Sequence, residues 1–177
     1  KYGKLKSITM ERISGDVKWG FEDWFHQEEK SGSVVLDLHV HDLDFLRYML
    51  GEPDSFQVKA SSFKSGMINH VITEYEFGDV FATAEGIWDE SPAVKFHAAF
   101  CAHFEDATIE FNSAQTPSVI VYKKDGTVET PELKAEYEGE SDVAGINVSN
   151  LGPYYTEIKY FQECVREDKP VVVAPLI

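Results

Sequence analysis

The chain has 177 residues, of which 43% are hydrophobic and 13% aromatic, a composition that indicates a globular domain with a core of its own. Its formal net charge is −15. Such an acidic chain offers no basic patch for nucleic-acid phosphates or for an anionic membrane surface. No apolar run approaches the ~20 residues that a membrane-spanning helix needs. Neither a nucleic acid nor a membrane is therefore expected as a partner.

The two cysteines, Cys101 and Cys164, lack the spacing of a metal or redox motif. We expect two reduced thiols in a cytoplasmic protein, because the sequence shows no signal peptide; a disulfide between them stays open. The sequence begins at Lys1 without a methionine and stops where an apolar segment has just begun. We therefore expect it to be a piece of a longer protein.

The first element in chain order is a strand at residues 4–13, where apolar and polar residues alternate in part. Residues 14–30 are polar and aromatic, which is typical of a loop or a short helical turn. Trp24 lies in this segment. An aromatic side chain in such a place can either line a pocket or plug the edge of a core, and both roles stay open for Trp24.

The central element is a buried helix predicted at residues 33–50. Ser31 or Ser33 can cap its start, and Gly51 followed by Pro53 can end it. Four leucines recur near the helical period of 3.6 residues and predict one apolar stripe. They are Leu36, Leu43, Leu46 and Leu50.

The rest of the chain alternates apolar and polar residues and predicts strands joined mostly by hairpins. The predicted strands are residues 56–61, 71–77, 80–88, 94–104, 108–111, 118–122 and 127–129. Gly78-Asp79 and Asp125-Gly126 mark hairpin turns. The acidic residues 131–150 predict a surface loop, and the helical spacing of apolar residues predicts a closing helix over Tyr154–Glu167.

These elements add up to two main helices and about seven strands. Hairpin connections make a mostly antiparallel sheet, so the predicted fold class is α+β, with an open-faced sheet and the helices packed on one face. The other face carries Ile72, Phe81 and Ile87. An apolar open face of this kind is expected to pair with another subunit.

Asp37 and His41 lie four residues apart, which on a helix places both side chains on one face, one above the other. A carboxylate beside an imidazole favours the protonated ring, whereas burial opposes it. Such a pair can exchange a proton near neutral pH. The same spacing also fits a structural pair that only satisfies a partly buried histidine, and the spacing alone leaves both interpretations open.

Two metal-binding interpretations are less favoured. Asp37, His39 and His41 stand in DLHVH, which is similar to the metal-binding opening of amidohydrolase-type barrels, but such a barrel needs ~250 residues. Three further candidate ligands on one strand face span ~20 Å, too far for one ion, and we expect them to be exposed or at an interface. They are His97, Cys101 and His103.

The sequence contains no glycine-rich nucleotide motif. None of its 12 glycines forms a G-x-G pair, and no P-loop lysine motif is present. A dinucleotide or phosphate site of the chain's own is therefore not expected.

The stretch SGSVVLDLHVHDLDFLRYMLGEP resembles the C-terminal domain of the Gfo/Idh/MocA family, the glucose–fructose oxidoreductase and inositol dehydrogenase group. The matching positions are Asp37, His41, Asp44 and Gly51. The stretch GPYYTEIKYFQECVREDKPVVV is similar to the family's closing helix and the segment after it, so the resemblance covers nearly all 177 residues. His39 departs from the pattern, because the family often has glycine there, and we expect a difference in packing or pocket shape.

The resemblance implies that residues 1–177 are one C-terminal substrate-binding and oligomerisation domain. The full-length protein would be an NAD(P)-dependent oxidoreductase acting on a sugar, polyol or related hydroxy compound, with its cofactor held by an N-terminal Rossmann domain that this chain lacks. His41 would be the catalytic acid/base, and Asp37 would orient it or bind substrate. Trp24 is a further candidate for substrate contact. The family's catalytic lysine, from its E-K-P motif, has no counterpart here.

The chain by itself would then bind neither cofactor nor metal and would be inactive. The resemblance further implies a homodimer or tetramer, formed through the open sheet face. Two alternatives remain: a non-catalytic sugar-binding or protein-interaction module, and a metal-dependent hydrolase using Asp37, His39 and His41.

Overall fold

The computed structural model describes residues 1–64, 66–131 and 152–171. These fall into two compact units, Lys1–Glu132 and Leu133–Ile177. The second unit contains helix α3 (Gly152–Glu167), which confirms the predicted closing helix. Apart from Pro131, the loop predicted at residues 131–150 lies outside the described residues.

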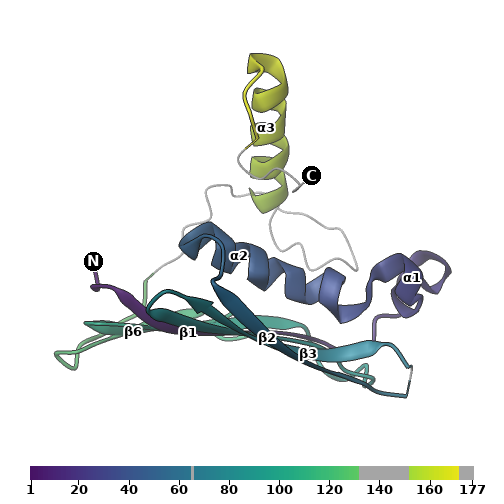
Figure 1. The fold of residues 1–177 in the computed structure, drawn as a ribbon, viewed down its shortest axis with the longest axis horizontal. Coiled ribbons are helices and arrows are strands. Elements are labelled where there is room, and N and C mark those ends of the chain that lie inside the picture. The colour runs from purple at the N-terminus through teal and green to yellow at the C-terminus, as the bar shows by residue number, and fades with distance from the viewer. Residues whose placement is uncertain (65, 132–151, 172–177) are drawn as a thin grey trace. The chain divides into compact units, whose positions relative to one another are not determined.

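The first unit is built on one sheet of eight strands, in the order β2-β3-β4-β1-β5-β6-β7-β8 (Figure 1). The strands are β1 Leu5–Ser14, β2 Ser55–Ser62, β3 Ile68–Phe77, β4 Val80–Trp88, β5 His97–Phe104, β6 Ala107–Asn112, β7 Val119–Lys123 and β8 Val128–Glu129. Every neighbouring pair is antiparallel except β1 and β4, which are parallel. The predicted fold class, α+β with a mostly antiparallel sheet, is confirmed.

Strand β5 begins at His97, so the predicted start at Val94 is wrong. The amide of Val94 donates to the carbonyl of Ser91 at 3.2 Å, which closes a turn just before the strand. Gly15 at the end of β1 packs against this turn, where an added Cβ would lie 2.3 Å from the Val94 carbonyl oxygen. The turn interrupts the strand although the alternation of residue types continues through it.

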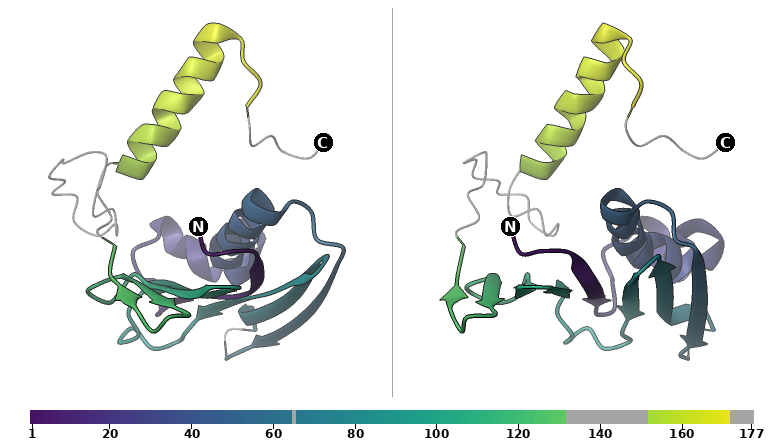
Figure 2. Two further views of the ribbon diagram at one scale, coloured as in Figure 1. Left: turned by 90° about the vertical axis from the view of Figure 1, so that its left-hand side faces the viewer. Right: turned by 60° about the vertical axis from the view of Figure 1, so that its left-hand side comes forward.

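All the helical segments of this unit lie on one face of the sheet (Figure 2). They belong to the connection from β1 to β2. They are the 3₁₀ helix η1 (Phe21–His26), α1 (Glu28–Ser31), the π-helical turn η2 (Val35–His39) and α2 (Val40–Leu50). Together η2 and α2 form the helix predicted at residues 33–50. None of the helices among the described residues is long and apolar enough to cross a bilayer.

The π-helical turn changes which leucines reach the core. Leu46 is fully buried, as predicted, but Leu36 is 64% exposed and Leu38 is buried in its place. A π-helical turn holds more residues than an α-helical one, so residues before it are rotated relative to those after it. The predicted stripe is therefore wrong at Leu36.

The helix approaches the sheet closely because β4 presents small residues beneath it. Ala82 and Ala84 are fully buried, and Leu46 packs with them and with Ile8 in one core cluster. Burial of a leucine such as Leu46 contributes about 1.5–3 kcal/mol. At Gly86, an added Cβ would lie 3.2 Å from the Cβ of His39, so only glycine fits there without displacing the helix.

The opposite face of the sheet is mixed rather than apolar. Phe81 is 50% exposed on it, but Glu11 of β1 and Glu85 of β4 lie directly opposite each other in the register. Each carboxylate contacts a histidine: Glu11 Oε1 lies 3.1 Å from His97 Nε2, and Glu85 Oε1 lies 2.7 Å from His70 Nε2. The prediction of an apolar open face is therefore only partly right.

Candidate functional site

The helix η2–α2 presents Asp37 and His41 on the side turned away from the sheet core. Asp37 is half-buried and His41 is exposed. Burial raises the pKa of the Asp37 carboxyl above its usual value, and the charge of His41 acts in the opposite direction. The two groups therefore interact through their charges, but the structure gives no hydrogen bond or ion pair between these two described residues, and the imidazole is open to solvent.

The start of this helix is fixed by two buried serines. The Ser33 amide donates to the Ser31 hydroxyl at 3.1 Å, and the Val35 amide lies 3.5 Å from the Ser33 hydroxyl. Ser33 adopts a φ of +61°, which turns the chain sharply into the helix. These contacts satisfy amides that a helix start leaves without partners, and they place Asp37 in the first turns.

His39 points the other way, into the interface with the sheet. It is 4% exposed, and its Nε2 lies 3.0 Å from both the Thr73 and the Tyr75 hydroxyl oxygens. Burial lowers the pKa of His39, so the ring is neutral at pH 7. His39 therefore does not converge with Asp37 and His41, as the amidohydrolase-like interpretation needs.

Asp42 is the second polar residue on the buried side of the helix. Its carboxylate is 2% exposed and accepts from Arg12 of β1, with Nη2 2.7 Å from Oδ1. Arg12 Nε lies 3.3 Å from both carboxylate oxygens, so the guanidinium spans the carboxylate. This ion pair joins the helix to the centre of the sheet.

Trp24 lies in η1, and its ring meets that of Phe25 edge to face at 5.0 Å. Phe25 in turn meets the buried Trp88 at 5.9 Å, and its carbonyl accepts from the Ser31 hydroxyl at 3.1 Å. Trp24 itself is 36% exposed. The structure thus ties Phe25 to the core and leaves part of Trp24 free for a ligand.

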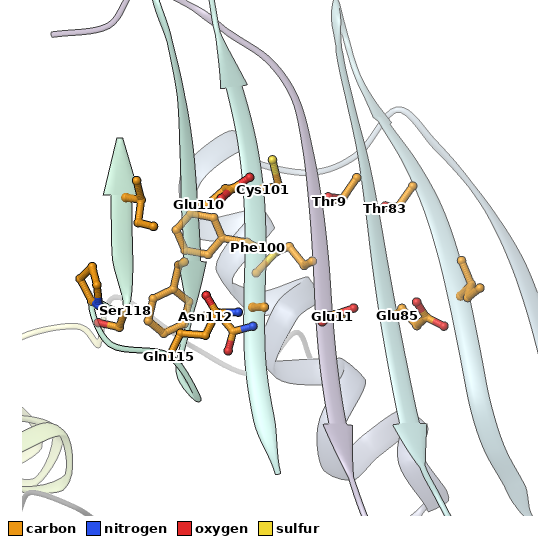
Figure 3. Close-up of a pocket in the computed structure, with 16 residues that line it drawn as sticks. Thr9, Glu11, Thr83, Glu85, Phe100, Cys101, Glu110, Asn112, Gln115 and Ser118 are labelled. Carbon is orange, nitrogen blue, oxygen red and sulfur yellow. The ribbon is translucent and has the colours of Figure 1, made fainter. Parts of the chain in front are cut away.

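A hollow of about 520 Å³ lies on the opposite, open face of the sheet (Figure 3). Strand residues and the loop before β7 line it, among them Thr9 and Glu11 of β1 and Thr83 and Glu85 of β4. None of the three predicted site residues contributes to it. The hollow and the outward pair on the helix are therefore different features of the domain.

The described residues offer no metal centre, because no group of three or more histidine, cysteine, aspartate or glutamate side chains could hold an ion. His97, Cys101 and His103 are no exception: His97 contacts Glu11, and Cys101 Sγ lies 3.5 Å from His103 Nε2. Cys101 and Cys164 are free thiols. The described residues contain no glycine-rich strand-to-helix turn of the kind that holds a dinucleotide pyrophosphate.

An open, mostly antiparallel sheet with helices on one face is the architecture of the C-terminal domains of sugar dehydrogenases. Residues 1–128 match the family described as GFO/IDH/MocA C-terminal domain, and the chain belongs to this family. A 1,5-anhydro-D-fructose reductase of Ensifer adhaerens is 26% identical over 135 residues, which make up 74% of this chain and 38% of that protein.

Solved structures show the same fold at lower identity. A levoglucosan dehydrogenase in complex with NADH matches 98% of this chain and 52% of its own, with a TM-score of 0.76 and 16% identity. The UDP-N-acetylglucosamine 3-dehydrogenase GnnA from Acidithiobacillus ferrooxidans matches 96% of this chain and 48% of its own, with a TM-score of 0.67 and 14% identity. The chain thus spans about half or less of these relatives.

Proposed function

We propose that this chain is the substrate-binding and oligomerisation domain of an NAD(P)-dependent oxidoreductase that acts on a sugar, a polyol or a related hydroxy compound. His41 is the acid/base, Asp37 orients it or binds a substrate hydroxyl, and Trp24 contributes an apolar contact. The cofactor is held by a second, dinucleotide-binding domain. Without that domain, the chain should show no turnover.

The observation that carries this proposal is the outward pair, Asp37 and His41, in a chain that belongs to an oxidoreductase family. The exposed imidazole of His41 is accessible to a substrate, as a general acid/base must be, and it interacts with the half-buried Asp37 through charge. The relatives' names support the substrate class: one is a reductase of 1,5-anhydro-D-fructose, and another was solved with NADH and levoglucosan.

The residues of this chain handle the proton of the reaction. When a hydroxyl-bearing carbon is oxidised, its hydrogen leaves with an electron pair, and the hydroxyl proton must leave separately. His41 takes that proton, and the nearby negative charge of Asp37 stabilises the imidazolium that results. In the reverse direction His41 returns the proton. Bound NAD(P) accepts or supplies the hydride.

The test uses the complete polypeptide with NAD⁺ or NADP⁺ and levoglucosan, and with NADH or NADPH and 1,5-anhydro-D-fructose or L-sorbose, followed by nicotinamide absorbance. His41→Ala should lower kcat/KM by about 10²–10⁴-fold, the usual share of general acid–base catalysis. Tyr48→Ala is the control, because Tyr48 lies on the same helix, is 78% exposed and has no part in the proposed site. Turnover unchanged in His41→Ala would remove His41 from the mechanism. A protein that binds these sugars without turnover would instead be a non-catalytic binding module.

We further propose that a second copy covers the open sheet face. Phe81 is 50% exposed there, and the half-buried Ile72 and Ile87 lie on the same face. A symmetric dimer buries the same patch of both subunits. Phe81→Glu should therefore lower the mass measured by light scattering to that of a monomer; an unchanged oligomeric mass would place the interface elsewhere.

A further inference from the structure

His39 stands between the two proposed catalytic groups in sequence and opposite to them in space. It is the last residue of the π-helical turn Val35–His39, with Asp37 two residues before it and His41 two residues after it. Asp37 and His41 face outward, whereas the His39 ring is 4% exposed and faces β3. Contacts that fix the His39 side chain therefore also restrain the backbone that carries Asp37 and His41.

Two directional contacts hold His39. Its Nε2 lies 3.0 Å from Tyr75 Oη and 3.0 Å from Thr73 Oγ1, two side chains that point from β3 to the same face. The Nδ1 atom is buried and has no hydrogen-bond partner. A buried N–H without an acceptor costs more than an unused lone pair, which favours the tautomer with the proton on Nε2. Nε2–H then donates to one of the two hydroxyls.

Apolar packing alone leaves the rotation of this turn loosely defined. Val34 and Leu38 pack the turn against Val71 and Trp88, but the attraction between apolar surfaces has no preferred direction. A π-helical turn is also one of two ways to wind the segment, because an α-helical turn would rotate Asp37 relative to His41. Hydrogen bonds to fixed strand hydroxyls distinguish the two windings.

Resting on the proposed function, we propose that His39 is a positioning residue: by its hydrogen bond to the Thr73 and Tyr75 hydroxyl pair it fixes the π-helical turn and thereby the placement of Asp37 relative to His41. It touches neither substrate nor cofactor. The Arg12–Asp42 ion pair, one helical turn further on, fixes the next part of the helix to β1.

The first readout is the electrostatic coupling between Asp37 and His41, which needs no substrate. The charge of His41 lowers the pKa of Asp37, so His41→Ala should raise the Asp37 pKa, measured by carbon NMR of labelled aspartate in the complete polypeptide. In a Thr73→Val/Tyr75→Phe background, the same replacement should shift the Asp37 pKa by less than half as much. The control background is Val121→Ala, which shortens a buried side chain of β7 outside the core cluster that contains Tyr75.

The second readout is kinetic, with the sugar of the panel above that is turned over fastest. Thr73→Val/Tyr75→Phe should lower kcat by about 10- to 100-fold, the range expected from a misplacement near 1 Å, and should move the pH profile of kcat. KM should change less than kcat. Thr73→Ser keeps the hydroxyl and should restore both kcat and the profile. If the double variant does not fold, Tyr75→Phe alone carries both readouts.

The positioning role is overturned if, in Thr73→Val/Tyr75→Phe, the His41→Ala replacement shifts the Asp37 pKa as much as in the wild-type background and kcat is unchanged. His39 would then contribute only to packing. The proposed function fails on a different result, unchanged turnover in His41→Ala. Loss of turnover in His41→Ala with wild-type behaviour of the double variant rejects only the role of His39.

Discussion

The ion pair between Arg12 and Asp42 predicts that removing Arg12 destabilises the fold more than removing the charge of Asp42. Asp42 is 2% exposed at its side chain and Arg12 is 21% exposed. Removing either partner leaves the other charge without its counter-ion. The partly exposed Arg12 can then turn toward water, whereas the buried Asp42 cannot. Arg12→Met should therefore cost about 3–5 kcal/mol of unfolding free energy, the usual effect of stranding a buried charge. Asp42→Asn should cost about 1–3 kcal/mol.

The assay is urea unfolding followed by tryptophan fluorescence, because Trp88 is buried in the same unit. For a chain of this size, Arg12→Met should lower Tm by on the order of 10 °C. The double variant Arg12→Met/Asp42→Leu replaces the pair by apolar groups of similar size and should lie within about 2 kcal/mol of wild type, or above it. Its recovery would show that stranded charge, rather than lost packing, destabilises the single variants.

The reasoning fails if Asp42→Asn costs as much as Arg12→Met, or if the double variant is no better than Arg12→Met. Equal costs would mean that Arg12 is as desolvated as Asp42. A double variant without recovery would mean that the shape of the pair matters more than its charge.

Three further predictions concern the helix. Burial raises the pKa of Asp37 above 3.8, so the folded protein keeps a proton that the unfolded chain has lost, and the contribution of Asp37 to stability should fall as the pH rises from 3.8 through the folded pKa. In urea unfolding at several pH values, the unfolding free energy of the wild type minus that of Asp37→Asn should decrease over this range; a difference independent of pH would refute the shift. Gly86→Ala should cost about 1–3 kcal/mol, because its Cβ would meet that of His39 at 3.2 Å; a neutral effect in calorimetry would mean that the helix can lift. Leu36→Ala should change stability by less than about 0.5 kcal/mol and Leu46→Ala should cost about 2–5 kcal/mol, and equal costs in urea unfolding would contradict the π-helical turn.

The sequence was sufficient for the elements and the fold class because both depend on periodicity. Alternation located the strands, and hairpin turns such as Gly78-Asp79 predicted that strands adjacent in the sequence pair antiparallel. The position of β1 between β4 and β5 depends on a long connection through the helices, which no local pattern encodes. The π-helical turn was missed for a similar reason: one extra residue in a turn leaves the apolar composition unchanged and shifts only the register.

Of the two polar contacts beneath the helix, only the ion pair of Arg12 and Asp42 had a signal in the sequence. Asp42 falls between Leu38 and Leu46 at four-residue intervals, so the buried stripe contains a carboxylate that needs a partner. Arg12 follows Ile8 and Met10 at two-residue intervals, which places a cation on the buried face of a strand. One acidic residue within the apolar stripe of the helix and one basic residue within that of the strand together predict a buried ion pair. His39 gave no such signal, because its position is buried only in the π-helical register.

The helix η2–α2 combines two roles that place opposite demands on its residues. On its inner side, His39 contacts β3 and Asp42 contacts β1. The core beneath the helix contains the small residues Ala82 and Ala84. Its outer side holds Asp37 partly desolvated, with a raised pKa, a state that costs stability rather than adding to it. An ordinary structural pair would lower the pKa of its carboxylate and stabilise the fold. The raised pKa of Asp37 follows from burial that the charge of His41 does not offset. A gain in stability together with a loss of turnover in Asp37→Asn would mark a residue retained for chemistry, whereas unchanged turnover would leave Asp37 and His41 as a structural pair.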